Sequence, residues 1–233
     1  MSIDTKSSKP RAYLWDELNW HPSPKQLQQL IKLQSLLQYW NTQTNLTRLI
    51  YGNDYWIGQV FDSLWPLKQE LQNPNEKLLC VDVGSGCGFP GLAAGIALTG
   101  SKVLLVDSVR KKTDILKKIT NELDLSTRIT FATKRIETIG QDYTFRGKFD
   151  LAMARAVSIA PVVSEYLIPL LKKKGEGLIY QGKWDQINQT KLNKALIFLN
   201  AKVKLIENKL LPEQRGERHI IRLIPKGKCP AKY

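Results

Sequence analysis

The residues best suited to chemistry lie in one glycine-rich segment, residues 78–91. Its apolar run ends in Asp82, and glycines follow at positions 84, 86 and 88. Glycine allows positive φ and lets a ligand approach the main chain. The helix expected from about Pro90 turns its free N–H groups toward the same space. This arrangement predicts a binding site for a nucleotide-type cofactor.

Asp107 ends the next apolar run, 103–106, sixteen residues after Gly91. An ionised carboxylate here can accept hydrogen bonds from both ribose hydroxyls, and each charge-assisted bond contributes about 1.5–3 kcal/mol. It can instead cap the helix that follows, or do both. A strand, a glycine turn, a helix and a second strand are the layout of a cofactor site at the carboxyl edge of a parallel sheet.

The spacing of the glycines does not by itself identify the cofactor, because residues 86–91 also satisfy the dinucleotide pattern G-x-G-x-x-G. Two features favour S-adenosylmethionine over a dinucleotide. Asp82 stands two residues before the first glycine, where it can meet a positively charged amino group or order the loop. Phe89 and Pro90 fill a turn that should stay small for a pyrophosphate.

The elements that position this site alternate along the chain. Alternation of strands and helices calls for right-handed crossovers and a parallel sheet. The last two strands are joined across residues 210–218, too few for a helical crossover, so they should pair antiparallel. The predicted fold class is α/β, a class I, Rossmann-like methyltransferase with a seven-stranded, mostly parallel sheet. Strands are expected at 78–83, 102–107, 129–132, 149–154, 177–181, 202–208 and 219–224, and helices near 90–98, 110–123, 161–172 and 185–199.

The first third of the chain is expected to be helical. Ser23 and Pro24 begin one helix as cap and first turn, and a second stretch runs from Asn53 to Pro66 or shortly beyond. Residues 1–22 should be loosely ordered or packed as a short arm. We predict an N-terminal helical extension over residues 1–72 and a methyltransferase domain over 73–233.

Composition limits the possible partners. The net charge is +14, from 35 Lys and Arg against 21 Asp and Glu, which favours a polyanion such as nucleic acid but also fits a plain basic surface. No tract is apolar enough for a membrane span, and the N-terminus lacks the apolar core of a secretory signal. Three cysteines suggest neither a disulfide framework nor a metal site, so a cytoplasmic protein is expected.

In combination, these motifs resemble the small-subunit ribosomal RNA guanine-N7 methyltransferase family, also called the glucose-inhibited division protein B family. The resemblance runs from about Trp40 to the final strand, and the order and spacing of its motifs are highly specific. It rests on residues 40–41, 45–47, 61–63, 82–91, 106–108, 110–111, 135–137, 154–156 and 216–219.

The resemblance implies an enzyme that methylates N7 of a guanine in 16S ribosomal RNA, free or in the small subunit. Separately, we expect a cytoplasmic monomer without a metal. Two positions depart from the family: Gln59 replaces a frequent His, and Gln181 replaces a frequent Lys. Glu137 would accept from the adenine amino group, with Ile136 against the ring. Carried over residue by residue, the S-adenosylmethionine contacts fall on Gly84, Phe89, Asp107, Ser108, Ile136, Glu137 and Arg155.

Residues 153–156, at the end of the fourth strand, restrict which atom of the substrate can be methylated. They lack the Asn or Asp-Pro-Pro-aromatic clamp of exocyclic-amine methyltransferases, and no cysteine is near for attack on a pyrimidine. Guanine N7 carries a free lone pair, so its methylation needs alignment and electrostatic stabilisation but no general base. Arg155 is the candidate catalytic residue, contacting cofactor and base or phosphate. Alternatively, Arg155 has only a structural role and forms an ion pair with Asp150 or Glu165.

Other basic residues are candidate RNA contacts. Arg110 and Lys111 begin a helix, where cations are unfavourable unless an anion is near, and Arg218 opens the last strand. Residues 172–174 are expected at a helix end, where lysines are ordinary. His219 is expected to pack or cap.

Three alternatives to the RNA methyltransferase remain. The first is methylation of a small metabolite, which predicts no steep salt dependence of RNA binding. The second is an NAD-dependent oxidoreductase. The third is a non-catalytic RNA-binding module, against which the intact Asp82, glycine turn and Asp107 argue.

Overall fold

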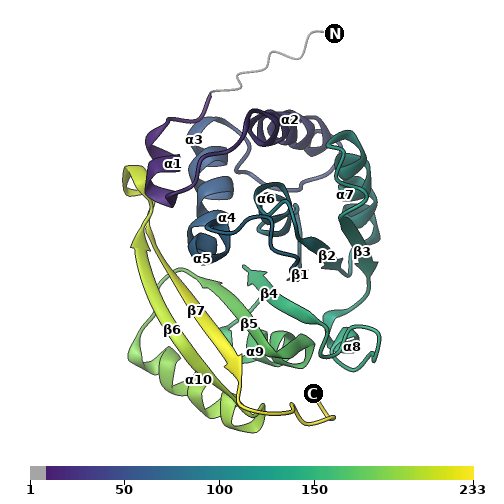
Figure 1. Cartoon of the computed structure of the whole chain (residues 1–233), viewed down its shortest axis with the longest axis vertical. Coiled ribbons are helices and arrows are strands. Elements are labelled where there is room, and N and C mark those ends of the chain that lie inside the picture. The colour runs from purple at the N-terminus through teal and green to yellow at the C-terminus, as the bar shows by residue number, and fades with distance from the viewer. Residues whose placement is uncertain (1–8) are drawn as a thin grey trace.

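The computed structural model describes residues 9–233 of the chain and contains one seven-stranded sheet (Figure 1). The strand order is β3-β2-β1-β4-β5-β7-β6. The first five strands in this order pair in parallel, and β7 pairs antiparallel with both β5 and β6. The predicted topology is confirmed. The strands are β1 Leu79–Val83, β2 Lys102–Asp107, β3 Ile129–Thr133, β4 Phe149–Arg155, β5 Leu171–Gln181, β6 Ala201–Leu210 and β7 Glu217–Pro225.

Helices cover both faces of the sheet, and alternate strand residues supply two cores. Cys80 of β1 belongs to the core under the N-terminal helices, whereas Val81 and Val83 belong to the core on the other face. The first face is also covered by α6 Gly91–Ala97 and α7 Arg110–Glu122, and the second by α9 Ala160–Leu167 and α10 Gln186–Phe198. The short helix α8 Ile136–Ile139 lies between β3 and β4 in the chain.

The sequence prediction was wrong about the start of β5. Helix α9 ends at Leu167, a 3₁₀ turn, η3 Ile168–Leu170, contains Pro169, and the strand begins at Leu171 rather than at 177. Proline lacks the N–H that would continue the helix, so the chain turns into the sheet early. Lys172, Lys173 and Lys174 therefore lie in β5, not at a helix end.

The N-terminal helices pack on the sheet and share its core. Helix α2 begins as predicted, because Ser23 and Gln26 form a reciprocal capping box. The second helical stretch continues past Pro66 through a 3₁₀ turn, so Pro66 does not end it. These elements are α1 Tyr13–Leu18, α2 Pro24–Asn41, α3 Gly52–Tyr55, the π-helical turn η1 Trp56–Phe61, α4 Asp62–Leu64, η2 Trp65–Leu67 and α5 Lys68–Leu71.

Burial shows how closely this extension joins the sheet. Trp56 and Phe61 are fully buried in the same cluster as Phe89 and Leu92 of the cofactor loop and α6. Residues 9–22 include the packed helix α1, while the rest of the predicted arm, residues 1–8, lies outside the described residues. The domain boundary at 72/73 stays a prediction. None of the helices within residues 9–233 has the length and apolar character needed to cross a bilayer.

Candidate active site

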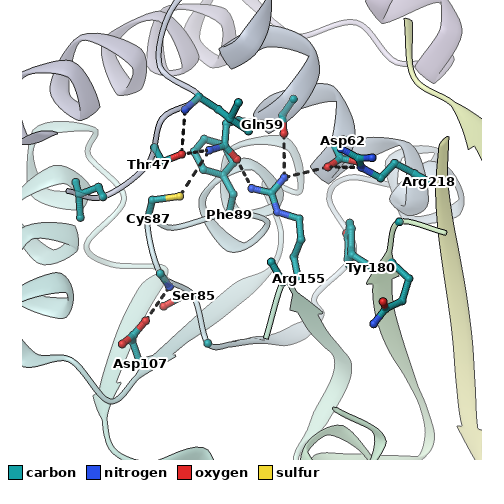
Figure 2. A pocket seen from close by; sticks show the side chains of 18 of the residues that line it. Thr47, Gln59, Asp62, Ser85, Cys87, Phe89, Asp107, Arg155, Tyr180 and Arg218 are labelled. Atoms are coloured by element: carbon teal, nitrogen blue, oxygen red, sulfur yellow. Dashed lines mark hydrogen bonds and ion pairs between the residues drawn. The ribbon is translucent and has the colours of Figure 1, made fainter. Parts of the chain in front are cut away.

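Two joined hollows lie at the carboxyl ends of the parallel strands, with volumes of about 560 and 360 Å³. They share Gly84, Asp107 and Lys112. The larger hollow reaches from the glycine turn to the ends of β5 and β7 and to the N-terminal helices (Figure 2). Ligands of open parallel sheets bind at this edge. All seven residues predicted to hold the cofactor line one hollow or both: Gly84, Phe89, Asp107, Ser108, Ile136, Glu137 and Arg155.

The loop after β1 is built around glycines that no other residue could replace without strain. Gly84, Gly86 and Gly88 have φ values of +71°, +55° and +97°. A Cβ on Gly84 would lie 2.7 Å from a methyl carbon of Val157. The loop is tied to β2 because the N–H groups of Gly84 and Ser85 donate to the carbonyl of Val106, both at 2.9 Å. The bare backbone of this loop therefore faces the hollows.

Asp107 holds the loop in place. One carboxylate oxygen accepts from the N–H of Gly86 at 2.9 Å, and the other accepts from the N–H of Val109 at 2.8 Å, directly before α7. Asp107 therefore fastens the turn before α7 but does not cap the helix, because Val109 is the N-cap residue and α7 has no side-chain cap hydrogen bond. Each carboxylate oxygen can accept more than one hydrogen bond, and Asp107 lines both hollows. The predicted contact with ribose remains compatible with these two hydrogen bonds.

Asp82, in strand β1, holds the end of the glycine loop in place. Its side chain is fully buried, and its Oδ2 accepts from the N–H of Gly91 at 2.8 Å. No hydrogen-bond donor within residues 9–233 reaches Oδ1. Burial, which disfavours the charged form, raises the pKa of Asp82 to about 7, against the lowering effect of the Gly91 N–H and of Arg155. Of the two roles considered for Asp82, the structure contains the loop contact.

The smaller hollow combines apolar and acceptor groups in the manner that adenosine requires. Ile136 and Val157 supply apolar surface, and Glu137 and Asp107 supply carboxylates. Glu137 accepts from Tyr166 Oη at 3.3 Å and is paired with Arg135, with half of its side chain exposed. Together with the bare glycine loop, these groups fit S-adenosylmethionine.

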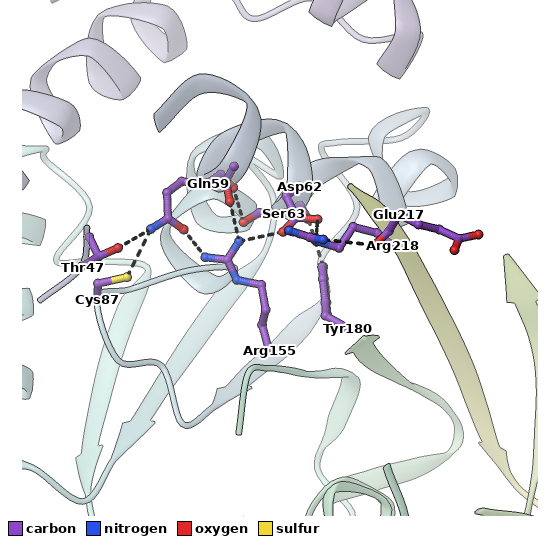
Figure 3. A network of polar contacts seen from close by, with 10 residues as sticks. Thr47, Gln59, Asp62, Ser63, Cys87, Arg155, Tyr180, Glu217 and Arg218 are labelled. Carbon is purple, nitrogen blue, oxygen red and sulfur yellow. Dashed lines mark hydrogen bonds and ion pairs between the residues drawn. The ribbon is translucent and has the colours of Figure 1, made fainter. Parts of the chain in front are cut away.

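Arg155 ends β4 and reaches across the larger hollow to the N-terminal helices (Figure 3). Its Nη1 donates to the carbonyl of Gly58 at 3.2 Å and to Asp62 Oδ2 at 3.3 Å, and its Nη2 donates to Gln59 Oε1. Its guanidinium lies 5.7 Å from the ring centre of Phe89. The alternative pairing with Asp150 or Glu165 is wrong. Asp150 is instead occupied by Lys172 at 2.7 Å and by the N–H of Leu79 at 2.8 Å.

The π-helical turn η1 explains how these acceptors reach Arg155. The N–H of Asp62 donates to the carbonyls of Ile57 and Gln59, not to that of Gly58, four residues back. The carbonyl of Gly58 is thereby available to Arg155. Wide turns of this kind occur often at functional sites. Residue spacing in the sequence does not reveal a single turn with altered helical period.

Asp62 and Gln59 are site residues that sequence reasoning missed. The carboxylate of Asp62 lies between Arg155 and Arg218, whose Nε is 3.4 Å from Asp62 Oδ1. Gln59 Nε2 donates to Thr47 Oγ1 at 3.0 Å and to Cys87 Sγ at 3.7 Å, which joins the helices to the glycine turn. The motif 61–63 and the departure at Gln59 were the signals available.

The predicted RNA contacts divide into two groups. Arg218 lines the larger hollow. Arg110 and Lys111 line neither: Arg110 pairs with Asp114 at 3.8 Å, and Lys111 Nζ donates to the carbonyl of Gln43 at 3.2 Å. Their neighbour Lys112 lines both hollows, because successive helix residues point in different directions. A contact of Arg110 and Lys111 with RNA stays a prediction.

The end of β5 and the glycine after it complete the larger hollow. Gln181, the second departure from the family pattern, lines it and donates to the carbonyl of Ser158 at 3.3 Å. His219 packs as expected, with Nδ1 2.7 Å from the carbonyl oxygen of Gly182.

The sheet order and the glycine loop define a class I S-adenosylmethionine-dependent methyltransferase. Two solved structures share this fold. An O-methyltransferase from Bacillus cereus, solved in complex with S-adenosylhomocysteine, superposes with a TM-score of 0.58 at 15% identity and covers 84% of this chain and 90% of that one. An S-adenosylmethionine-dependent O-methyltransferase from Thermotoga maritima gives 0.54 at 14% identity, over 84% and 73%.

Sequence comparison identifies the family. Residues 26–221 match the family described as rRNA small subunit methyltransferase G, or GidB. The chain is 53% identical over 233 residues to ribosomal RNA small subunit methyltransferase G of Prochlorococcus marinus strain MIT 9303, covering all of this chain and 94% of the relative. It is 52% identical to the protein of that name in Parasynechococcus marenigrum strain WH8102, over 97% and 91%. The chain belongs to the rRNA small subunit methyltransferase G family.

Proposed function

We propose that this protein transfers a methyl group from S-adenosylmethionine to N7 of a guanine in 16S ribosomal RNA. The observation that carries the proposal is the meeting of two sets of groups in one hollow. The glycine loop and Asp107 line this hollow together with Arg155 and Arg218. The names of the relatives support a ribosomal RNA substrate.

The proposed division of the hollows follows the chemistry of their walls. The adenosine part of the cofactor would lie in the smaller hollow, beside Ile136 and Glu137, with its ribose at Asp107. Its amino-acid part would lie along Gly84 and the following loop. When bound, the cofactor supplies an electrophilic methyl group. The remainder of the larger hollow would receive the target nucleotide.

Methylation at N7 fits the larger hollow, whose carboxylates within residues 9–233 already have partners in the protein. No histidine of residues 9–233 lines either hollow. The carboxylate of Asp107 is engaged by two backbone N–H groups and that of Asp62 by two arginines. The N7 lone pair needs no deprotonation, so alignment and a suitable electrostatic field suffice for the reaction.

Arg155 is the proposed catalytic residue because it borders the cofactor loop and the substrate side at once. Three acceptors from one helical segment fix its guanidinium, and Phe89 lies against it. A guanidinium held in this manner can hold the base or an adjacent phosphate with little reorganisation.

Binding of the RNA would depend on positive charge. The net charge of +14 and the cations Lys112, Arg155 and Arg218 around the hollow suit a phosphate backbone. RNA affinity should therefore fall steeply between low and moderate salt. A flat response would favour a small-metabolite substrate instead. We further propose that the protein acts as a monomer in the cytoplasm, where its three unpaired cysteines would stay reduced.

The test is methylation of small subunits and of free 16S ribosomal RNA from cells that lack this enzyme. Labelled S-adenosylmethionine marks the product, and borohydride reduction followed by aniline cleavage reports 7-methylguanosine at a single position. We expect one labelled guanine, cleaved by this treatment. Label at another atom, or no label in RNA while a small molecule is methylated, would contradict the proposal.

A further inference from the structure

We infer that Asp62 reads the target base by accepting hydrogen bonds from N1–H and N2–H of guanine. The inference rests on the proposed function, since it assigns the base-recognition group for that reaction. It concerns the side of the larger hollow that lies across from Asp107. Figure 2 shows Asp62 and Arg218 at one side of the hollow and Ser85 and Asp107 at the other.

One oxygen of the Asp62 carboxylate lies in an ion pair with Arg218 but has no hydrogen-bond donor within residues 9–233. Its Oδ2 accepts from Arg155 at 3.3 Å and from Arg218 at 3.5 Å. Its Oδ1 receives no hydrogen bond from residues 9–233, although the side chain is only 7% exposed and borders the hollow. A buried acceptor without a donor is costly, so an unmet group in the wall of a site indicates a ligand that supplies the donor.

The two neighbouring arginines suit this carboxylate to base recognition, because they reduce its electrostatic repulsion of RNA. Arg155 and Arg218 both lie within 3.5 Å of it and offset its charge. The Asp62 carboxylate can therefore serve as a directional hydrogen-bond acceptor in the partly desolvated wall of the hollow. Tyr180 and Gln181 also line the hollow, and the Oη of Tyr180 donates to the carbonyl of Ser63 at 2.9 Å.

Access to Oδ1 depends on Arg218. Its Nε lies 3.4 Å from Oδ1 without a hydrogen bond to that atom, and its side chain is 33% exposed. Arg155, which holds the other oxygen, is 15% exposed and has three acceptors. Arg218 is therefore the arginine that can rotate aside when a base enters, and its charge would then be free for a phosphate.

The match to guanine follows from hydrogen-bond donors. Among the standard bases, only guanine presents two adjacent donors, N1–H and N2–H, on its Watson–Crick edge. A carboxylate accepts both at once. Enzymes that modify an extruded base read this edge. Guanine N7 lies on the opposite side of the base, so a base held at Asp62 would direct N7 back toward the glycine loop.

The experiment compares guanosine with inosine, which lacks the N2 amino group, at the mapped target position of otherwise identical ribosomal RNA. We expect kcat/KM of the wild-type protein to be about 10- to 100-fold higher for guanosine. In Asp62→Asn, the ratio should fall to within about threefold of one, because an amide cannot accept from both donors.

A matched control separates base reading from the positioning of Arg155. Gln59→Leu removes another acceptor of Arg155 but leaves Asp62 in place, so it should slow both substrates while keeping the wild-type ratio. A wild-type ratio near one, or an unchanged ratio in Asp62→Asn, overturns the inference while N7 methylation stands. Methylation of a different atom by the wild-type protein overturns the proposed function and the inference together. The wild-type ratio decides the inference even if Asp62→Asn does not fold.

Discussion

Two arginine–carboxylate clusters join the sheet to the N-terminal helices, and they differ in what they leave unsatisfied. Arg222 of β7 is 3% exposed and donates to both oxygens of Glu70, at 2.8 and 3.0 Å, to Glu176 at 2.8 Å and to the carbonyl of Pro66 at 2.6 Å. Arg155 of β4 makes longer bonds to Gly58 and Asp62 and borders the hollow.

The difference separates a structural cluster from a functional one. The Arg222 cluster is closed, and its donors and acceptors are matched within the protein. The Arg155 cluster is open on one side, keeps Asp62 Oδ1 without a hydrogen bond, and lies against the cofactor loop. A buried ion pair that is fully matched is costly to break, whereas an incompletely matched pair beside a cavity retains capacity for a ligand.

Breaking the closed cluster should have the largest effect. Arg222→Met leaves Glu70 and Glu176 without their buried partner, so the free energy of unfolding should fall by about 3–5 kcal/mol. Turnover of the remaining folded protein should be unchanged. Urea unfolding combined with single-turnover methylation measures both quantities. A stable Arg222→Met protein would contradict the structural role.

Breaking the open cluster should produce the opposite pattern. Arg155→Ala should lower turnover by about 10²–10³-fold, the usual cost of losing one preorganised electrostatic group. The free energy of unfolding should change far less than in Arg222→Met, because Asp62 keeps Arg218 as a partner. Near-normal turnover would show that Arg155 is not catalytic.

Asp107 tests the cofactor side of the hollow. Asp107→Ala removes the proposed ribose acceptor, so affinity for S-adenosylhomocysteine should weaken by about 10- to 100-fold, or about 1.5–3 kcal/mol. Calorimetric titration measures this change, with Glu70→Gln as a control whose cofactor affinity should stay at the wild-type value. Unchanged affinity in Asp107→Ala would remove the ribose assignment.

Buried carboxyl groups in the two regions should respond differently to pH. Burial raises the pKa of Glu176, but hydrogen bonds from Lys204 and Arg222 outweigh it and leave the pKa below the usual value. Within residues 9–233, Asp82 accepts a hydrogen bond from the N–H of Gly91, and burial raises its pKa to about 7.

The direction in which Asp82 changes protein stability with pH follows from the difference between its folded and unfolded pKa values. Its folded pKa lies above the unfolded value, so its contribution to stability is fully present at low pH and is lost as pH rises through about 7. Between pH 6 and pH 8 the loss should be about 1 kcal/mol. Asp82→Asn should remove this part of the pH profile. An identical profile in wild type and Asp82→Asn would contradict the assignment.

Much of this architecture was accessible from the sequence because local patterns encode it. The glycine loop, Asp107 and the alternation of strands and helices predicted the sheet and its cofactor edge. The early start of β5 was missed because Leu171 leads into a lysine run that reads as the end of an amphipathic helix, not as a strand.

The partners of Arg155 could not be predicted in the same way. Gly58, Gln59 and Asp62 lie more than ninety positions earlier in the chain, and a π-helical turn brings them to Arg155. Long-range packing of that kind has no periodic signal. The resemblance to a family supplied Asp62 as part of a motif, but not what it contacts.

We expect the methyl donor to occupy the joined hollows beside β1 and β2, next to Arg155. A crystal structure of the protein with S-adenosylhomocysteine would reveal whether it lies there. We expect the amino-acid part of the ligand along Gly84, its ribose at Asp107 and its adenine beside Ile136 and Glu137. A ligand bound elsewhere, or empty hollows at saturating concentration, would contradict this placement.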